Sequence, residues 1–340
     1  MADYGVAVLG TGRLGGRYVD IAKQTPGAHM VVVAEPREEQ VAPLKEKHPD
    51  VGFVADFREA IAHPEVDVII CTLPHWLHKD AAIAAARAGK HVYTEKPMAA
   101  WLSDAEEMMA EARKAGVKLM TAHTQRYFPA VKAMQQIVSS GRLGKPVMAH
   151  DIWHFPYRPH TRPEWMLDRK LGGGMGQMAS THQFDRLLWF FGNDVRSVAA
   201  KVGPLTHPEY DRSDDSAMYF MRWESGMVAT VSMCGWRTGA VEYGGTVFFT
   251  NGMAKFNLSY SGTGEQTGVW VADSTNGEWK FEAVEERDSM LDEFTAFVES
   301  LQRGDADTPV PQEHGLRVLR VLEAAEESSR RGEEVRVEIR

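Results

Sequence analysis

A glycine-rich turn close to the N-terminus constrains the fold more than any other feature. The segment YGVAVLGTGRLGGRYVDIAKQ has an apolar run at 6–9, then Gly10, Gly12 and Gly15, then apolar positions at helical spacing. The pattern Gly-x-Gly-x-x-Gly between a strand and a helix is typical of dinucleotide-binding folds. The glycines there permit a tight turn, close approach of a pyrophosphate and close packing of helix on strand. The N–H groups that begin the helix attract phosphate.

The second half of this nucleotide-binding pattern is also present. The apolar run HMVVVAEP ends at Glu35, about twenty residues after the third glycine. A carboxylate at that position accepts hydrogen bonds from ribose hydroxyls and repels a 2′-phosphate, which favours NAD over NADP. Arg37 stands close enough to bind that phosphate, so NADP is not excluded. The alternative is a structural glycine turn with a solvated Glu35.

Strands and helices continue to alternate up to about residue 123. Strand-like runs at 67–74, 91–94 and 117–123 alternate with helical patterns at 57–66, 78–90 and 102–116. This spacing indicates a doubly wound parallel sheet, and we predict an NAD(P)-binding Rossmann domain over 1–123. Pro74 and Lys96 then follow carboxyl ends of strands, where ligands bind in such sheets.

The pattern changes after residue 123. Strand-like runs at 145–155, 195–203, 214–223, 226–236, 244–251 and 252–260 are separated by turn signals such as Glu224-Ser225-Gly226. Tight turns between alternating strands favour a large, open, mostly antiparallel sheet. We therefore predict an α+β substrate-binding and oligomerisation domain over 124–340. Two helices, at 289–304 and 313–332, close it and can pack back on the first domain.

Composition excludes several classes of protein. The formal charge of -9 has no basic block to offset it, which argues against nucleic acid or an anionic membrane as a partner. The two cysteines, Cys71 and Cys234, form no disulfide framework, and no metal-binding motif is recognisable. The chain opens without a signal-like segment, and its apolar runs are shorter than the roughly 20 residues that span a bilayer. We expect a cytoplasmic protein without a metal ion.

Several segments in order resemble the Gfo/Idh/MocA oxidoreductases, the family of glucose-fructose oxidoreductase and inositol dehydrogenase. They are the glycine loop, CTLPHWLH, AGKHVYTEKPMA, GRLGKPVMAHDIW and GGGMGQMASTHQFDRLLWFFG. The resemblance implies that Lys96 of Glu95-Lys96-Pro97 reaches the substrate beside the nicotinamide and that the Lys96–Pro97 bond is often cis. It also implies a homodimer or homotetramer formed through the C-terminal sheet. A lysine held there can share in deprotonating a hydroxyl, since desolvation lowers its pKa. A solvated lysine is the alternative.

The resemblance also places a histidine and an aspartate at His182 and Asp185. With Trp189 they fall on one face of a predicted helix. His182 could relay the carbinol proton and Asp185 could bind hydroxyls, although a structural histidine–aspartate pair is the common alternative. The chain departs from the family pattern at Met178, where many relatives have an aspartate, and at Ser180, where a glycine is common. This departure puts a simple polyol dehydrogenase reaction in doubt.

The remaining candidates come from loops. The polar and aromatic stretch 154–170 could close over a sugar, and Arg126 matches a family position close to the cofactor cleft, where a structural role is equally expected. The candidate substrate-binding residues are Lys96, Tyr157, Arg158, His160, Trp165, His182 and Asp185, of which Lys96, His182 and Asp185 are the candidate catalytic residues. The candidate cofactor-binding residues are Gly10, Gly12, Arg13, Leu14, Gly15, Glu35, Arg37, Thr72, Pro74, His78, Glu95, Lys96 and Arg126.

These features predict an NAD(P)-dependent dehydrogenase or reductase that acts on a secondary hydroxyl or ketone of a sugar, sugar acid or cyclitol. Two other functions stay open. One is an NAD-dependent glycosidase or lyase that oxidises its substrate transiently without net redox change. The other is a non-catalytic, sugar-sensing relative, which the Met178 departure permits.

Overall fold

A computed structural model describes residues 3–258, 266–275 and 277–338. The chain forms two compact units, one of residues 1–124 and 288–316, the other of residues 125–287 and 317–340. The predicted domain division after residue 123 stays a prediction. The last two residues of the predicted strand at 252–260, Ser259 and Tyr260, lie outside the described residues.

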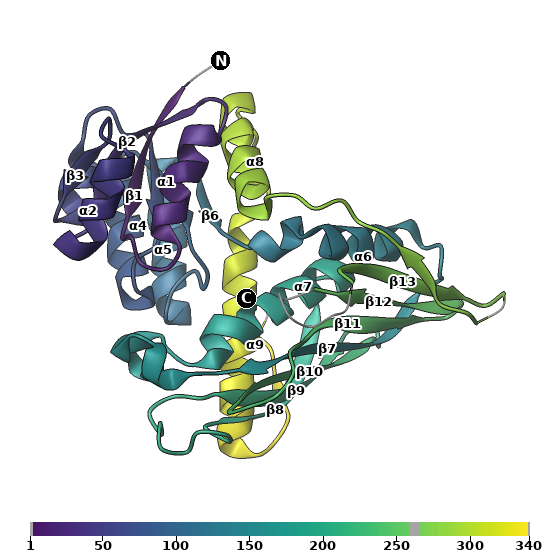
Figure 1. The fold of residues 1–340 in the computed structure, drawn as a ribbon. Helices are drawn as coiled ribbons and strands as arrows, with labels where there is room; N and C mark the ends of the chain where they lie inside the picture. The colour runs from purple at the N-terminus through teal and green to yellow at the C-terminus, as the bar shows by residue number, and fades with distance from the viewer. Residues whose placement is uncertain (1–2, 259–265, 276, 339–340) are drawn as a thin grey trace. The chain divides into compact units, whose positions relative to one another are not determined.

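The first unit contains a parallel sheet of six strands among the described residues, in the order β3-β2-β1-β4-β5-β6 (Figure 1). The strands are β1 (Tyr4–Leu9), β2 (Ala28–Ala34), β3 (Gly52–Val54), β4 (Val68–Cys71), β5 (His91–Thr94) and β6 (Leu119–Thr121). The helices are α1 (Gly15–Gln24), α2 (Glu38–Lys47), α3 (Phe57–Ala62), α4 (His78–Arg87), α5 (Leu102–Ala115) and α8 (Ser289–Arg303). The predicted doubly wound sheet is confirmed.

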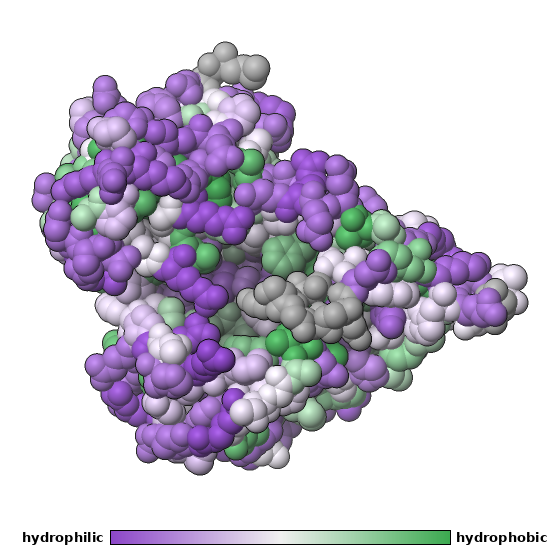
Figure 2. Space-filling model, viewed as in Figure 1, coloured by the Kyte–Doolittle hydropathy of each residue, from purple (hydrophilic) through white to green (hydrophobic). Residues whose placement is uncertain are grey.

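Continuous apolar runs explain why these strands lie inside. Every residue of β4 is buried, as expected for a parallel strand covered on both faces. Helix α8 comes from the far end of the sequence and lies beside α1 (Figure 1). Its apolar face contributes Phe294 and Phe297 to the core that also holds Tyr18 and Tyr93. On the face of this unit that Figure 2 shows, most side chains are hydrophilic.

The second unit contains a sheet with nine strands among the described residues, in the order β14-β13-β12-β11-β7-β10-β9-β8-β15. The strands are β7 (Pro146–Pro156), β8 (Val195–Gly203), β9 (Ser216–Trp223), β10 (Val228–Trp236), β11 (Glu242–Phe249), β12 (Gly252–Asn257), β13 (Gly268–Asp273), β14 (Lys280–Glu282) and β15 (Val335–Arg336). All described pairs are antiparallel except β7 with β10. The predicted open, mostly antiparallel sheet is confirmed.

Helices cover one face of this sheet. Helix α6 (Pro129–Ser140) packs on β12 and β13, and α7 (Thr181–Phe191) packs on α6 and β7 (Figure 1). Helix α9 (Gln312–Arg331) follows near the C-terminus. No helix in the described ranges is long and apolar enough to cross a membrane.

Candidate active site

The glycine turn after β1 is tied to both neighbouring strands. Gly10 has a φ of 83°, and its N–H donates to the carbonyl oxygen of Ala34 at 2.8 Å. The Thr72 hydroxyl donates to the Gly10 carbonyl oxygen at 2.7 Å. Positive φ is favoured by glycine because other residues have a Cβ that clashes there. The end of β1 is therefore fixed in the tight turn that the sequence predicted.

The turn has the properties of a pyrophosphate cradle. A Cβ built on Gly12 meets no heavy atom of the described residues within 4 Å, so the backbone there faces open space. Helix α1 begins after Leu14 with no side-chain cap and no acidic residue in its first turn, as far as the structure describes the chain. Its first N–H groups and the positive end of its dipole are thus available to phosphate. The turn fits a bound dinucleotide, with Arg13 exposed beside it.

Two glycine substitutions should separate folding from dinucleotide binding. A Cβ on Gly15 would lie 2.0 Å from the Gly10 carbonyl oxygen, so Gly15→Ala should destabilise the protein by about 1–3 kcal/mol. Gly12→Ala meets no such obstacle, yet it places a methyl group in the proposed cradle. We expect unchanged thermal stability and roughly tenfold weaker NAD binding, equivalent to about 1.4 kcal/mol. Thermal unfolding and NAD titration measure both effects. Equal loss of stability in the two variants would contradict this assignment.

Glu35 follows β2 and is almost fully enclosed by hydrogen-bond donors. Its oxygens accept from the Thr11 N–H at 2.8 Å, from the Thr11 hydroxyl at 2.9 Å, and from Arg37 Nε and Nη2 at 2.7 and 2.9 Å. Burial alone would raise the pKa of Glu35, but the hydrogen bonds from Arg37 and Thr11 outweigh burial and lower it to about 2. Glu35 is thus ionised throughout the physiological range. The Arg37 side chain is half exposed, so its guanidinium also faces solvent.

His78 supports the loops at the carboxyl edge of the sheet from within. The side chain is fully buried, with Nδ1 3.0 Å from the Pro97 carbonyl oxygen and Nε2 2.8 Å from the Leu73 carbonyl oxygen. It therefore joins the loop after β4 to the loop after β5. Pro74 begins the short 3₁₀ turn His75–Leu77 that precedes α4. The geometry gives His78 a supporting role, and its direct contact with a cofactor stays a prediction.

Lys96 stands directly after β5 and Glu95, at the edge where parallel strands end. The Lys96–Pro97 peptide bond is cis, as the resemblance implied. The Lys96 N–H donates to Glu95 Oε2 at 3.1 Å. Burial lowers the pKa of Lys96 to about 8; the Glu95 carboxylate opposes this shift, whereas the Arg13 cation adds to it. An amine with such a pKa exchanges a proton near neutral pH, which an ordinary surface lysine does not.

In the second unit, α7 presents the face that the sequence predicted. Asp185 is fully buried and accepts from Arg126 Nε at 2.8 Å. The Arg126 guanidinium also lies 5.2 Å from the ring centre of Trp189. Arg126 thus connects two residues of this face. The ion pair gives Asp185 a structural partner inside the same unit, and its contact with a substrate stays a prediction.

His182 lies one residue inside α7 and packs against β7. Its ring centre is 5.8 Å from that of Trp153, which in turn stacks on Tyr243 at 4.4 Å. Met178 belongs to the π-helical turn Gly176–Ser180 that precedes α7, one turn before His182. The turn contains no charged residue, so it adds no charge beside the imidazole.

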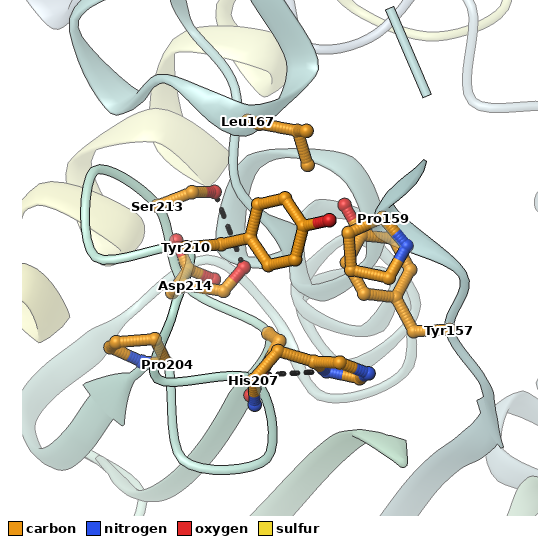
Figure 3. Close-up of a pocket in the computed structure, with 9 residues that line it drawn as sticks. Tyr157, Pro159, Leu167, Pro204, His207, Tyr210, Ser213 and Asp214 are labelled. Atoms are coloured by element: carbon orange, nitrogen blue, oxygen red, sulfur yellow. Dashed lines mark hydrogen bonds and ion pairs between the residues drawn. The ribbon is translucent and has the colours of Figure 1, made fainter. Parts of the chain in front are cut away.

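The loop candidates lie in different surroundings from one another. Arg158 and His160 are exposed and Trp165 is half-buried, whereas Tyr157 is buried at 3% exposure. Several residues of this unit line a small cavity (Figure 3), which has room for about one water molecule. Its lining residues are Tyr157, Pro159, Leu167, Pro204, His207, Tyr210, Ser213, Asp214 and Asp215. The Tyr157 ring meets the His207 ring edge-on at 5.9 Å. Tyr157 thus packs within its own unit, and its predicted stacking on a sugar stays untested.

The buried side chains that lie near Glu95, the neighbour of Lys96, were not identified from the sequence. Tyr18 donates to Glu95 at 2.7 Å, and Tyr93 donates to Glu293 at 2.9 Å. Glu293 offered a signal, because a carboxylate falls between Met290 and Phe297 on the apolar face of α8. A charged residue on such a face is buried only when it has partners.

Comparison with known proteins decides the family. Residues 4–123 match the model of the oxidoreductase family with an NAD-binding Rossmann fold, and residues 131–255 match the GFO/IDH/MocA C-terminal domain. The chain belongs to this family. It is an oxidoreductase with an NAD-binding Rossmann domain, as predicted.

Individual relatives cover the chain to different extents. A 1,5-anhydro-D-fructose reductase from Ensifer adhaerens is 31% identical over 65% of this chain and 66% of its own length. A myo-inositol 2-dehydrogenase from Thermotoga maritima is 26% identical over 98% of both chains. A solved levoglucosan dehydrogenase, in complex with NADH and levoglucosan, superposes with a TM-score of 0.87 over 99% of this chain and 100% of its own. At 21% identity, this last likeness shows the fold alone.

Proposed function

We propose that the chain transfers a hydride between NAD(P) and a secondary hydroxyl or ketone of a sugar, sugar acid or cyclitol. The observation that carries the proposal is the place of Lys96, half-buried directly after β5 in the unit that contains the glycine turn, where burial lowers its pKa to about 8. The names of the relatives support the substrate class, since they include an anhydrosugar reductase and an inositol dehydrogenase.

Residues of the chain transfer the hydroxyl proton and orient the substrate. Bound nicotinamide supplies the hydride acceptor in oxidation and the hydride donor in reduction. Lys96, as a neutral amine, accepts the proton of the carbinol hydroxyl in oxidation, and as an ammonium returns it in reduction. The Glu95 carboxylate stabilises the ammonium. We also propose, on the family pattern, that His182 takes part in the same proton transfer and that Asp185 orients the substrate.

A screen over sugars, cyclitols and their acids tests the proposal. NAD and NADP are supplied in parallel, and the absorbance of the reduced cofactor is followed together with product formation. Substrate-dependent cofactor reduction is the expected result. Product formation without net reduction would instead identify a glycosidase or lyase, the function that Met178 in place of an aspartate keeps open. Sugar binding without turnover would identify a sensor.

The ion pair between Arg37 and Glu35 affects the expected preference between NAD and NADP. Because the Arg37 guanidinium is half exposed, it is available to a 2′-phosphate, while Glu35 disfavours one. We expect Arg37→Ala to weaken NADP binding by roughly tenfold, as for the loss of a charge-assisted hydrogen bond, and to leave NAD binding within about twofold. Competitive titrations of both cofactors measure the ratio. Arg58→Ala is the control, since Arg58 pairs with Asp56 on the surface of the same unit. An unchanged ratio would contradict the proposed role of Arg37.

We further propose that the open face of the second sheet forms a homodimer or homotetramer. Met148 on β7 and Met218 on β9 are 41% and 63% exposed on strands that flank β10. Large exposed apolar side chains on a sheet face are typical of interaction surfaces. The mass in solution, from light scattering, tests this proposal.

A further inference from the structure

A carboxyl group lies fully buried in the core of the first unit, away from the surface. Glu293 on α8 has no exposed surface. Its oxygens accept from the Tyr93 hydroxyl at 2.9 Å, from the His123 N–H at 2.7 Å and from the Thr124 hydroxyl at 2.6 Å. Burial of a carboxyl group costs free energy of folding unless the group is well hydrogen-bonded or paired.

Two hydrogen bonds and a contact between two phenols connect Glu293 to the loop that bears Lys96. The Tyr93 and Tyr18 side chains interact, and their two rings meet edge-on at 5.7 Å. The Tyr18 hydroxyl donates to Glu95 Oε1 at 2.7 Å. Tyr18, Tyr93 and Glu293 are fully buried, and Glu95 is 9% exposed. Two carboxyl groups are thus joined by two phenols, with little access to water.

The two carboxyl groups compete for one proton. Burial raises the pKa of Glu293 to about 8, and the Glu95 charge adds to this shift. Burial also raises the pKa of Glu95, while the Lys96 cation lowers it. Two negative charges in one apolar core are unfavourable, so near neutral pH a proton stays on the pair.

We propose that Glu95, Tyr18, Tyr93 and Glu293 form a proton relay that sets the charge beside Lys96. In the first state Glu293 carries the proton and Glu95 is ionised. In the second, Glu293 gives its proton to the Tyr93 oxygen, Tyr93 gives its own to Tyr18, and Tyr18 gives its own to Glu95. Each O–H bond that breaks is replaced by one that forms, so no net charge is created.

The protonation state of the relay affects the pKa of Lys96, because the Glu95 carboxylate is the counter-charge of the Lys96 ammonium. The groups that act on the Lys96 charge are Glu95, which favours the ammonium, and Arg13, which disfavours it. When Lys96 loses its proton, an ionised Glu95 loses its partner, and the proton of the chain moves to Glu95. This shift stabilises the neutral amine. The inference rests on the proposed function, in which Lys96 alternates between amine and ammonium.

Two substitutions test the relay through the titration of Lys96 itself. The pKa of Lys96 is measured by NMR of isotope-labelled lysine in the protein without cofactor, and Lys96→Arg assigns the signal. Glu293→Gln removes the partner that shares the proton. Tyr93→Phe removes a hydrogen bond that stabilises the Glu293 carboxylate, so the proton then stays on Glu293. Either substitution should leave Glu95 ionised and raise the pKa of Lys96 by about one unit. The double variant should show no further rise. Tyr219→Phe is the control: it deletes a buried hydroxyl that is hydrogen-bonded to Ser180 at 3.0 Å, and it should leave the pKa of Lys96 unchanged.

Other outcomes would overturn the relay. If Glu293 acted only by its charge through space, Glu293→Gln would lower the pKa of Lys96, and Tyr93→Phe would not alter that effect. If the chain were merely structural, the variants would lose thermal stability while Lys96 titrated as in the wild type. The pKa of Lys96 and the thermal stability are both measured without turnover. A substrate screen in which no compound reacts would therefore contradict the proposed function and not the relay.

The unsubstituted protein offers an independent measurement, should a variant fail to fold. Infrared spectra of the carboxyl C=O stretch are recorded as pH is raised through the titration of Lys96. We expect one protonated carboxyl band to shift in frequency, since the proton moves from Glu293 to Glu95. Disappearance of that band without a replacement would show that the proton leaves for solvent, which would overturn the relay.

Discussion

Replacing Lys96 by alanine should reduce kcat for the oxidation of a sugar or cyclitol by roughly 10²–10⁴-fold, the usual contribution of a positioned general base. The loss should appear in kcat more than in KM, because proton transfer occurs in the transition state. Lys79→Ala is the matched control, since this lysine is also half-buried, lies on α4 of the same unit and pairs with Asp104 at 2.7 Å. We expect that control to retain nearly full activity.

The pH dependence of the reaction tests whether Lys96 is the group that accepts the proton. The neutral amine is the base, so kcat/KM for oxidation should rise with pH and level off above the Lys96 pKa of about 8. Reduction needs the ammonium and should show the opposite trend. In Lys96→Ala the inflection near pH 8 should vanish. An inflection that persists in this variant would assign the titrating group elsewhere, with His182 the next residue to replace.

The same pKa has a consequence for folding stability. The folded protein binds the Lys96 proton less tightly than the unfolded chain, where the pKa is near its ordinary 10.5. The contribution of this group to stability therefore increases as pH rises from about 8 to 10.5 and is least favourable below 8. Lys96→Met should be less sensitive to pH across that window.

The sequence predicted those parts of the fold that depend on local patterns. The glycine turn, the carboxylate of Glu35 and the strand ends at Pro74 and Lys96 follow from short segments whose geometry is set by nearby residues. Helix α2 was missed because EEQVAPLKEK buries only Val41 and contains Pro43, so it lacks an apolar period. Strand β3 has three residues, too few to show an alternation.

The surroundings of the site depend on contacts that no local pattern encodes. Tyr93 lies in a predicted strand, but its partner Glu293 is 200 positions away in sequence. The ring of Tyr157, for which stacking on a sugar stays a prediction, meets the His207 ring edge-on, a contact that no local pattern indicates. An aromatic residue in a polar loop is equally compatible with binding a ligand and with packing on its neighbours, so its contacts within the protein depend on tertiary structure that the sequence pattern does not encode.

Arg186→Met should cause the largest loss of stability, about 3–5 kcal/mol, because it leaves a buried carboxylate without its counter-charge. Arg186 on α7 and Asp151 on β7 are 0% and 1% exposed, and they are joined at 2.7 and 3.1 Å. Arg186 also donates to Gln125. Thermal unfolding, with hydrogen exchange of β7 and α7 to locate the loss in the second unit, measures the effect.

A matched control and a rescue variant separate charge from packing. Arg222→Met removes an exposed ion pair with Glu334 in the same unit, and it should cost less than about 1 kcal/mol. Arg186→Met combined with Asp151→Leu removes both charges and should recover most of the lost stability, because a buried pair and its apolar replacement differ little in free energy. No recovery in the double variant would show that the hydrogen bonds of this network matter more than the balance of charge.

The loss in Arg186→Met should also depend on pH. Burial raises the pKa of Asp151 in the wild type, and Arg186 opposes that shift. Without the arginine, the folded-state pKa should rise further above that of the unfolded chain. Because the folded state then binds the Asp151 proton more tightly, the destabilisation should be greatest at neutral and high pH. It should decrease as pH falls through the folded-state pKa toward the ordinary value of 3.8. A deficit independent of pH between 4 and 8 would show that the vacated volume, and not the stranded charge, determines the loss.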